Sequence, residues 1–231
     1  MKLIHKMTLL ISLCNFFISC SGQANERNQP NRSTPKTIAE NSIQNFENSE
    51  FTYYGIPKKI SSIDTSAGWK QEGQKIVLTG TVFKQDGKTP AAGVLMYYYQ
   101  TNTEGRYVHK PEEARSMAPN NLGQTHGYIR GWVKTNEDGK YFIYTLRPGT
   151  YPASEEPAHV HVTIKEPGEL KEYYIDDFVF EDDPFLTLSK RQKLEKRAGD
   201  GIVKLEPKGN IHMGKRNIVL GLNIPGYPGK N

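Results

Sequence analysis

Two histidines separated by a single residue, His159 and His161, are the side chains of this sequence best placed to do metal chemistry. They lie in an apolar-alternating run, so a β-strand would put both imidazoles on one face, with their Cα atoms ~6.6 Å apart. That spacing lets both rings reach one metal ion. An isolated pair of this kind is more often ordinary surface or interface histidine, so the pair alone does not decide the matter.

Two tyrosines, Tyr107 and Tyr151, are the candidate oxygen ligands for the same ion. Together with the histidines they would supply two neutral nitrogens and two anionic oxygens. Phenolates are hard donors that suit a hard trivalent ion better than Zn²⁺ or Cu⁺. The four residues therefore indicate a non-haem ferric site. The tyrosines by themselves say less, because the chain has 13 Tyr and most are expected as half-buried strand residues.

The first 20 residues have the pattern of a secretory signal. A basic start is followed by an apolar core over 7–18, which is too short for a transmembrane helix, and then by Ser19-Cys20. Cys20 at this break predicts a bacterial lipoprotein, exported and held at the membrane of the cell envelope only by its lipid. The alternative is an ordinary cleaved signal, because Phe17 stands where lipoprotein signals usually carry leucine.

Residues 21–50 are rich in Asn, Gln, Ser, Pro and Glu, and this composition cannot bury enough surface to offset the entropy of ordering. We therefore expect a flexible tether there and one compact domain over 51–231. The only two cysteines are Cys14 and Cys20. Without them the domain has no thiol, which excludes disulfides and thiolate metal sites.

The formal net charge of +5 is unevenly distributed along the chain. Residues 151–183 carry ten acids against two lysines, a net charge of −8, whereas bases dominate over 190–216. Nothing places these bases on one face interleaved with aromatic residues. A nucleic-acid partner is therefore not expected.

Short apolar or alternating runs, separated by Gly, Asp and Pro turn signals, predict an all-β fold built as an antiparallel β-sandwich. The loop over 136–139 is a good hairpin connection, with Gly139 able to take a positive φ. The one plausible helix covers about 188–197. The expected strands lie at 75–83, 93–101, 128–134, 141–146, 158–165, 173–180 and 217–224.

Taken in order, the motifs over 77–221 resemble those of the intradiol ring-cleavage dioxygenases, the catechol and protocatechuate dioxygenase superfamily. Four ligand-type residues in the family order and with these flanks are far more specific than the opening and hairpin motifs, which generic prealbumin-like sandwiches share. The segments that carry the resemblance are 80–83 (GTVF), 86–94 (DGKTPAAGV), 105–107 (GRY), 130–142 (RGWVKTNEDGKYF), 146–152 (LRPGTYP), 157–161 (PAHVH), 180–184 (FEDDP) and 218–221 (IVLG).

The resemblance implies a prealbumin-like sandwich that holds Fe³⁺ through Tyr107, Tyr151, His159 and His161, with water or hydroxide as a fifth ligand. It also implies a catalytic part for Tyr151, the ligand that departs when a catechol chelates the iron. The expected reaction uses O₂ to cleave a catechol-type diol between its two hydroxyl carbons. The product would be a cis,cis-muconate-type diacid.

The sequence departs from the family pattern at two positions of the expected substrate pocket, which would include Ala153, Glu156 and Asp177. Glu156 stands where many members carry arginine, and Asp177 where glutamine is common. Both changes add a carboxylate, so we expect poor use of carboxylated catechols. They also leave open a non-catalytic iron-binding or ligand-binding surface module. An oligomer stays unassigned, because the family's helical dimerisation segment has no counterpart.

The remaining histidines are predicted to play no part in the site. His109 and His126 lie in polar, loop-like stretches and are expected at the surface, and His212 is expected in a loop. Tyr97 and Tyr98 are expected to alternate between core and surface along a strand rather than to bind iron. Arg130 could line the pocket or form a structural ion pair.

Overall fold

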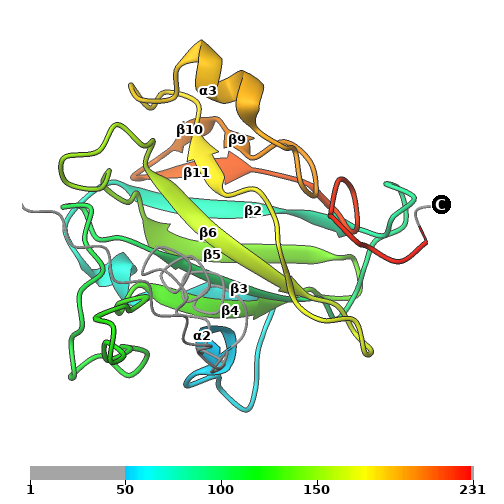
Figure 1. The fold of residues 1–231 in the computed structure, drawn as a ribbon, viewed down its shortest axis with the longest axis horizontal. Coiled ribbons are helices and arrows are strands. Elements are labelled where there is room, and N and C mark those ends of the chain that lie inside the picture. The colour runs from blue at the N-terminus through cyan, green and yellow to red at the C-terminus, as the bar shows by residue number, and fades with distance from the viewer. Residues whose placement is uncertain (1–49, 230–231) are drawn as a thin grey trace, which may run out of the picture.

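The computed structural model describes residues 50–229, which form two six-stranded sheets (Figure 1). The predicted signal over 1–20 and nearly all of the predicted tether lie outside the described residues. One sheet contains, in spatial order, β1 (Ile63–Thr65), β5 (Lys140–Leu146), β2 (Lys75–Phe83), β11 (Ile211–Lys215) and β10 (Leu205–Lys208), with β12 (Ile218–Val219) also pairing with β2. The other contains β4 (Arg130–Lys134), β3 (Leu95–Gln100), β6 (His159–Lys165), β8 (Phe178–Phe180) and β9 (Ile202–Val203), with β7 (Tyr173–Tyr174) also pairing with β6.

The longest strand pairings are antiparallel, which confirms the predicted all-β sandwich. β2 pairs with β5 over seven residue pairs, and β3 pairs with both β4 and β6. Parallel pairs occur as well, where β1 meets β5, β11 and β12 meet β2, and β9 meets β8. A parallel pair needs a long crossover connection, and these strands are joined through long stretches of intervening chain.

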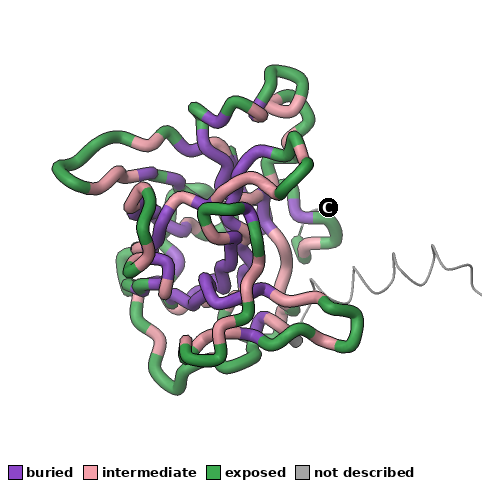
Figure 2. The backbone as a smooth tube through the Cα atoms, turned by 90° about the vertical axis from the view of Figure 1, so that its left-hand side faces the viewer, coloured by how far each residue is buried: buried purple, intermediate pink, exposed green. Residues whose placement is uncertain are grey.

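Alternation along the strands divides inward from outward side chains. Val160, Val162 and Ile164 of β6 face the apolar core between the sheets, where each is fully buried. Period-2 geometry then sends His159 and His161 to the outer face of the same sheet. In Figure 2 the buried strands lie at the centre and exposed loops surround them. The chemistry-bearing residues are therefore on the outer face of the sheet, under its loops.

The helices are short. The predicted helix begins at Leu188 as α3 (Leu188–Lys193), with the Thr187 side chain accepting a bond from the Lys190 amide as an N-cap. It ends earlier than predicted, because Leu194 is already extended. The others are α2 (Glu50–Tyr53) and a 3₁₀ turn, η1 (Ala67–Lys70). Across 50–229, no helix is long and apolar enough to cross a membrane.

Helix α2 and the residue that follows it pack against the outer face of β3 and β4. The Trp132 indole donates a 2.7 Å hydrogen bond to the Thr52 carbonyl oxygen, and the Arg130 guanidinium donates to the Tyr54 carbonyl. Arg130 is fully buried, with the rings of Trp132 and Tyr97 centred 4.9 and 5.4 Å from its guanidinium carbon. Arg130 forms no ion pair with a described residue, because its neighbours are aromatic rings rather than carboxylates. It also does not line the cavity beside the histidines, so the structure shows neither of its two predicted roles, pocket residue or ion-pair partner.

Candidate metal centre

Strand β6 brings the two predicted histidines together on its outer face. Backbone pairing places His161 opposite Tyr99 of β3 and His159 opposite Val179 of β8. The two Nε2 atoms are 3.0 Å apart. His159 is buried and His161 is partly exposed. Both rings therefore point at one place beside the sheet.

Both predicted tyrosines reach that place from separate loops. The Oη atoms of Tyr107 and Tyr151 are 2.8 Å apart. The Tyr151 Oη also lies 3.1 Å from His159 Nε2 and 3.2 Å from His161 Nε2. The structure thus brings together all four residues that the sequence singles out as candidate ligands.

Glycines allow the two tyrosine loops to approach this closely. A Cβ on Gly105 would lie 1.7 Å from the Thr150 carbonyl oxygen, and one on Gly149 would lie 2.3 Å from the Thr103 carbonyl oxygen. Gly105 also has a φ of +73°, which glycine adopts without steric cost. The Gly149 amide donates a 2.9 Å bond to the Asn102 carbonyl. Any side chain at these glycines would push the two loops, and hence Tyr107 and Tyr151, apart.

The hydrogen bonds at Nδ1 of His159 and His161 determine which ring nitrogen carries the lone pair. The Nδ1 of His159 lies 2.7 Å from the Pro157 carbonyl oxygen, and the Nδ1 of His161 lies 2.9 Å from a carboxylate oxygen of Asp177. Both partners are acceptors, so each Nδ1 carries the proton and donates it. Each Nε2 then presents a lone pair to the centre. Two lone pairs 3.0 Å apart repel one another unless a cation or a hydrogen-bond donor such as the Tyr151 hydroxyl lies against them.

The charges at the centre also fit a bound cation. Burial, and then the neighbouring Tyr151, raises the pKa of the Tyr107 phenol well above its usual range. Burial, and then His161, lowers the pKa of His159, so this imidazole stays neutral, which is the form that binds metals. A cation reverses the first effect, because its charge stabilises phenolate. The donor set of two phenol oxygens and two imidazole nitrogens therefore fits a hard trivalent metal ion.

An aromatic stack supports the centre from behind. The Tyr99 ring stacks on His161 with centroids 4.5 Å apart, and on His126 with centroids 3.5 Å apart. The Tyr99 hydroxyl lies 2.5 Å from that of Tyr174. The prediction that His126 lies at the surface is wrong, since it is 2 % exposed and its Nδ1 is 2.7 Å from the Tyr97 hydroxyl. Burial, and then His161, lowers the His126 pKa to about 2, so the ring stacks as a neutral group.

The two remaining histidines of residues 50–229, His109 and His212, lie away from the centre. His109 is exposed and bonds to Ser116, as predicted for a surface residue. His212 lies in β11 rather than in the expected loop. Tyr98 is fully buried on the inward face of β3 and Tyr97 is on the outward face, so the two side chains alternate. The prediction that one of them lies at the surface is wrong, because Tyr97 is 1 % exposed and packs in a second buried cluster with Tyr99 and Trp132.

A cavity of about 780 Å³ opens beside the two histidines. Of the three predicted pocket residues, Glu156 and Asp177 line it. Ala153 does not, and its exposed side chain projects from a turn in which its own φ is +57°. The apolar part of the wall comes from Pro157, Ile175, Val179, Leu186 and Leu194, and the hydroxyl-bearing part from Tyr174.

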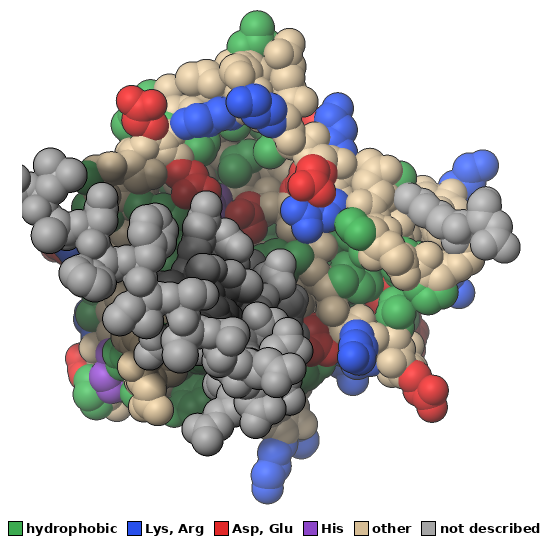
Figure 3. Space-filling view, viewed as in Figure 1, with side chains coloured by type: hydrophobic (Ala, Val, Ile, Leu, Met, Phe, Trp, Pro, Cys, Tyr) green, Lys and Arg blue, Asp and Glu red, His purple; other side chains and the backbone are tan. Residues whose placement is uncertain are grey.

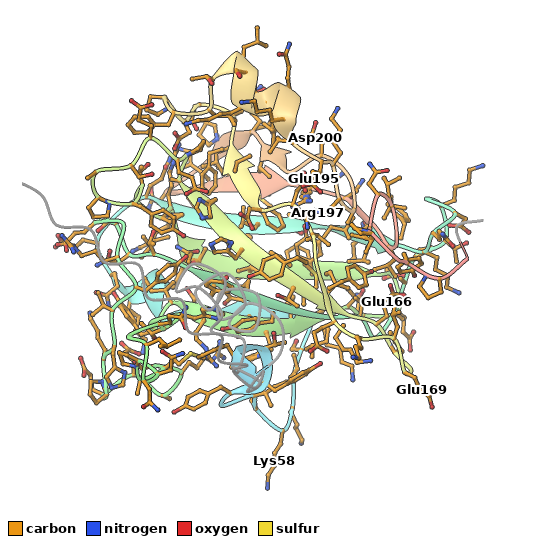
Figure 4. All side chains as sticks on the ribbon, viewed as in Figure 1. Lys58, Glu166, Glu169, Glu195, Arg197 and Asp200 are labelled. Carbon is orange, nitrogen blue, oxygen red and sulfur yellow. The ribbon has the colours of Figure 1, made fainter. Side chains whose placement is uncertain are left out.

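Charged side chains of both signs surround this cavity, and Figure 3 shows acidic and basic groups close together on the face below α3. Arg197 pairs with Glu195 at 3.0 Å and with Asp176 at 3.6 Å. Glu195 and Arg197 lie side by side where the chain leaves α3 (Figure 4). The lining carboxylates are Glu155, Glu156, Asp176, Asp177 and Glu195, and the lining cations are Lys190, Lys193 and Arg197.

Comparison with known proteins identifies the family. A family model described as "Dioxygenase" matches residues 53–203. The chain belongs to the intradiol ring-cleavage dioxygenase family. The members of this family are oxidoreductases that use non-haem iron. The predicted resemblance is thereby confirmed.

Two curated relatives show how far the similarity extends. The protocatechuate 3,4-dioxygenase beta chain of Burkholderia cepacia is 35 % identical over 98 residues, which is 40 % of this chain and 39 % of that one. The catechol 1,2-dioxygenase of Acinetobacter baylyi is 25 % identical over 152 residues, which is 54 % of this chain and 46 % of that one. The match spans less than half the length of either relative.

Solved structures of other dioxygenases share the fold. The dioxygenase domain of a carbohydrate-binding fusion protein from Streptomyces sp. SirexAA-E aligns over 71 % of this chain and 91 % of that domain, with a TM-score of 0.50 at 21 % identity. The catechol 1,2-dioxygenase of Acinetobacter radioresistens aligns over 71 % and 57 %, also with a TM-score of 0.50, at 17 % identity. At these identities the likeness concerns the fold alone.

Proposed function

We propose that this intradiol dioxygenase family member binds Fe³⁺ and uses O₂ to cleave catechol-type diols to cis,cis-muconate-type diacids. The observation that carries the proposal is the convergence of Tyr107, Tyr151, His159 and His161, with both Nε2 lone pairs facing the centre. When bound there, ferric iron would supply a Lewis acid and a template for a chelating diol. The other parts of the chemistry fall to residues of the chain.

Tyr151 is the better placed of the two tyrosines to release its ligand position. The Tyr107 ring packs in the apolar cluster of Tyr97, Tyr99 and Trp132, with its centroid 5.9 Å from that of Tyr99. Tyr151 has no place in that cluster and leads into the turn at Ala153. Moving Tyr151 therefore exposes less packed apolar surface. Its phenolate, once released, can accept one of the two catechol protons.

The cavity beside the histidines fits a single aromatic ring. Its volume of about 780 Å³ lies within the usual range for small-molecule pockets. Pro157, Val179 and Leu186 provide apolar wall for the faces of a ring. Five carboxylates against three cations give the lining a net negative charge, which disfavours a carboxylate substituent. Catechols without such a group are the proposed substrates.

The proposal includes export and attachment to a bacterial membrane through a lipid on Cys20. The support is the sequence alone, namely the basic start, the short apolar core over 7–18 and the Ser19-Cys20 break. Fractionation of cells that express the full chain tests it. Cys20→Ser should move the protein out of the membrane fraction, and a variant that stays there would contradict the lipid anchor.

Oxygen uptake with catechol tests the activity directly. The iron-loaded full chain should consume O₂ and form a diacid that absorbs in the near ultraviolet. Tyr107→Phe should abolish uptake, whereas Tyr144→Phe, which removes a phenol on β5 of the other sheet, should not. If the iron-loaded protein consumes no O₂ with any of a panel of substituted catechols, the non-catalytic iron-binding alternative replaces this proposal.

A further inference from the structure

The two candidate histidine ligands differ in what holds their outer nitrogens. His159 donates from Nδ1 to a neutral backbone carbonyl, that of Pro157, at 2.7 Å. His161 donates from Nδ1 to a carboxylate oxygen of Asp177 at 2.9 Å. A carboxylate is the stronger acceptor, because the hydrogen bond is charge-assisted. The two imidazoles are therefore unequal donors.

We infer that Asp177 is a positioning residue that fixes the tautomer and ring orientation of His161 and makes its Nε2 a stronger electron donor toward a ferric ion. This inference rests on the proposed function. A carboxylate behind a ligating imidazole locks the ring in place and raises its basicity. Tyr99 stacks on the face of the same ring at 4.5 Å, so His161 is held at one edge and on one face.

The backbone of Asp177 is itself fixed, which lets its carboxylate act as a rigid support. Arg216 is buried, and it donates a 2.5 Å hydrogen bond to the carbonyl oxygen of Asp176 and one of 3.3 Å to that of Arg197. On the other side Gly201 packs so closely that a Cβ there would lie 2.4 Å from the Asp177 carbonyl oxygen. The loop between β7 and β8 therefore has little freedom to carry the carboxylate away.

The geometry assigns Asp177 to the outer position rather than to the ligand set. Polar atoms of His159, His161 and Asp177 lie within 4.8 Å of one another, which alone would allow all three to share an ion. The carboxylate oxygen, however, bonds Nδ1 of His161, while the Nε2 of that ring faces Tyr151 and His159. The imidazole ring thus stands between Asp177 and the centre.

Three variants of the full chain test the inference. Asp177→Ala removes both the acceptor and its charge, and Asp177→Asn keeps an acceptor oxygen without the charge. Glu155→Gln is the matched control, because Glu155 lines the same cavity but its carboxylate forms no hydrogen bond or ion pair with another described residue, and the bond that Lys190 donates to its backbone carbonyl is kept. In the metal-free protein, ¹⁵N–¹H correlation spectra report which nitrogen of neutral His161 carries the proton. In the ferric protein, competition with a chelator reports the affinity for iron.

The expected results differ between the variants. His161 should be the Nδ1–H tautomer in the wild type and in Glu155→Gln, and a mixture of tautomers in Asp177→Ala. Asp177→Ala should lower the ferric affinity about 10- to 100-fold. Asp177→Asn should give a smaller loss and move the phenolate-to-iron absorption band to longer wavelength, because the iron becomes more electron-poor.

These measurements distinguish failure of the role given to Asp177 from failure of the proposed iron site. If Asp177→Ala keeps the wild-type tautomer, and both variants bind iron as tightly as Glu155→Gln, the inference is wrong even though the iron site stands. If the wild type takes up no Fe³⁺, the proposed function fails, and the tautomer in the metal-free protein still decides whether Asp177 orients His161. A thermal unfolding curve of each metal-free variant confirms that it is folded.

Discussion

Gly105 offers a sharp test of how the loops build the centre. Its φ is +73°, in the left-handed region, where alanine costs about 1–2 kcal/mol. Its Cβ would also lie 1.7 Å from the Thr150 carbonyl oxygen, although real Cβ contacts are essentially never shorter than 3.0 Å. Because that oxygen belongs to the backbone, no side-chain rotation relieves the clash. Gly105→Ala must therefore separate the two loops by more than 1 Å.

Separation of the two loops would move the two candidate tyrosine ligands apart. Tyr107 is two residues after Gly105, Tyr151 is the residue after Thr150, and their Oη atoms are 2.8 Å apart. A misplacement of about 1 Å in an active site can lower the rate about 100-fold. We expect Gly105→Ala to lose about that factor in kcat/KM for catechol. Its visible phenolate-to-iron absorption, measured at equal iron content, should weaken.

Gly87→Ala separates the clash from the backbone strain. Gly87 has a φ of +68°, but nothing lies within 4 Å of the position its Cβ would take. Backbone strain should lower the unfolding free energy of Gly87→Ala by about 1–2 kcal/mol, as it does in Gly105→Ala. Gly87→Ala should nevertheless keep the visible absorption of the wild type and its kcat/KM for catechol. If both alanine variants have the same absorption and activity, the argument that Gly105 brings the tyrosine loops together is refuted.

Three further predictions concern stability, specificity and pH. The buried Tyr98 hydroxyl donates a 2.6 Å hydrogen bond to Asp64, so Tyr98→Phe should lower the unfolding free energy in urea by about 1.5–3 kcal/mol, and an unchanged midpoint would contradict this. The iron-loaded protein should have a higher kcat/KM for catechol than for protocatechuate, and Glu156→Arg should lower the ratio of these two values. A higher kcat/KM for protocatechuate in the wild type would overturn the role given to the cavity charge. Burial, and then a neighbouring carboxylate, raises the pKa of Tyr53 and Tyr227 to about 12, whereas unfolded tyrosine ionises near 10. Between pH 10 and 12 the unfolded chain therefore loses these protons while the folded state retains them. The unfolding free energy should be constant just below a pH of about 10 and should fall as the pH rises toward 12.

The strands that form the core were predictable because their side chains alternate. β2 was predicted at its observed bounds, and β6 to within one residue, since apolar residues face inward at every second position. The hairpin of β10 and β11 was not predicted. β10 contains Glu206 and Pro207, shows no apolar alternation and is largely exposed. It is held in the sheet by its backbone pairing with β11 and not by the burial of its side chains.

The candidate ligands were predictable, but the groups behind them were not. His159 and His161 are two residues apart on one strand, so their common face follows from period-2 geometry. The stack of His126 on Tyr99 joins residues 27 positions apart, through a loop whose polar composition is typical of a surface. Sequence spacing carries no signal for such a contact. Likewise Ala153 follows Tyr151 closely in sequence but turns away from the cavity, because the backbone reverses at that point.

Resonance Raman spectroscopy of the iron-loaded protein, excited in its visible absorption band, tests the central claim most directly. Convergence of Tyr107 and Tyr151 on a ferric ion predicts a coloured protein with phenolate vibrations in that spectrum, which Tyr107→Phe and Tyr151→Phe should each reduce. A ferric protein that is colourless, or whose spectrum lacks phenolate vibrations, would show that these oxygens do not bind the metal.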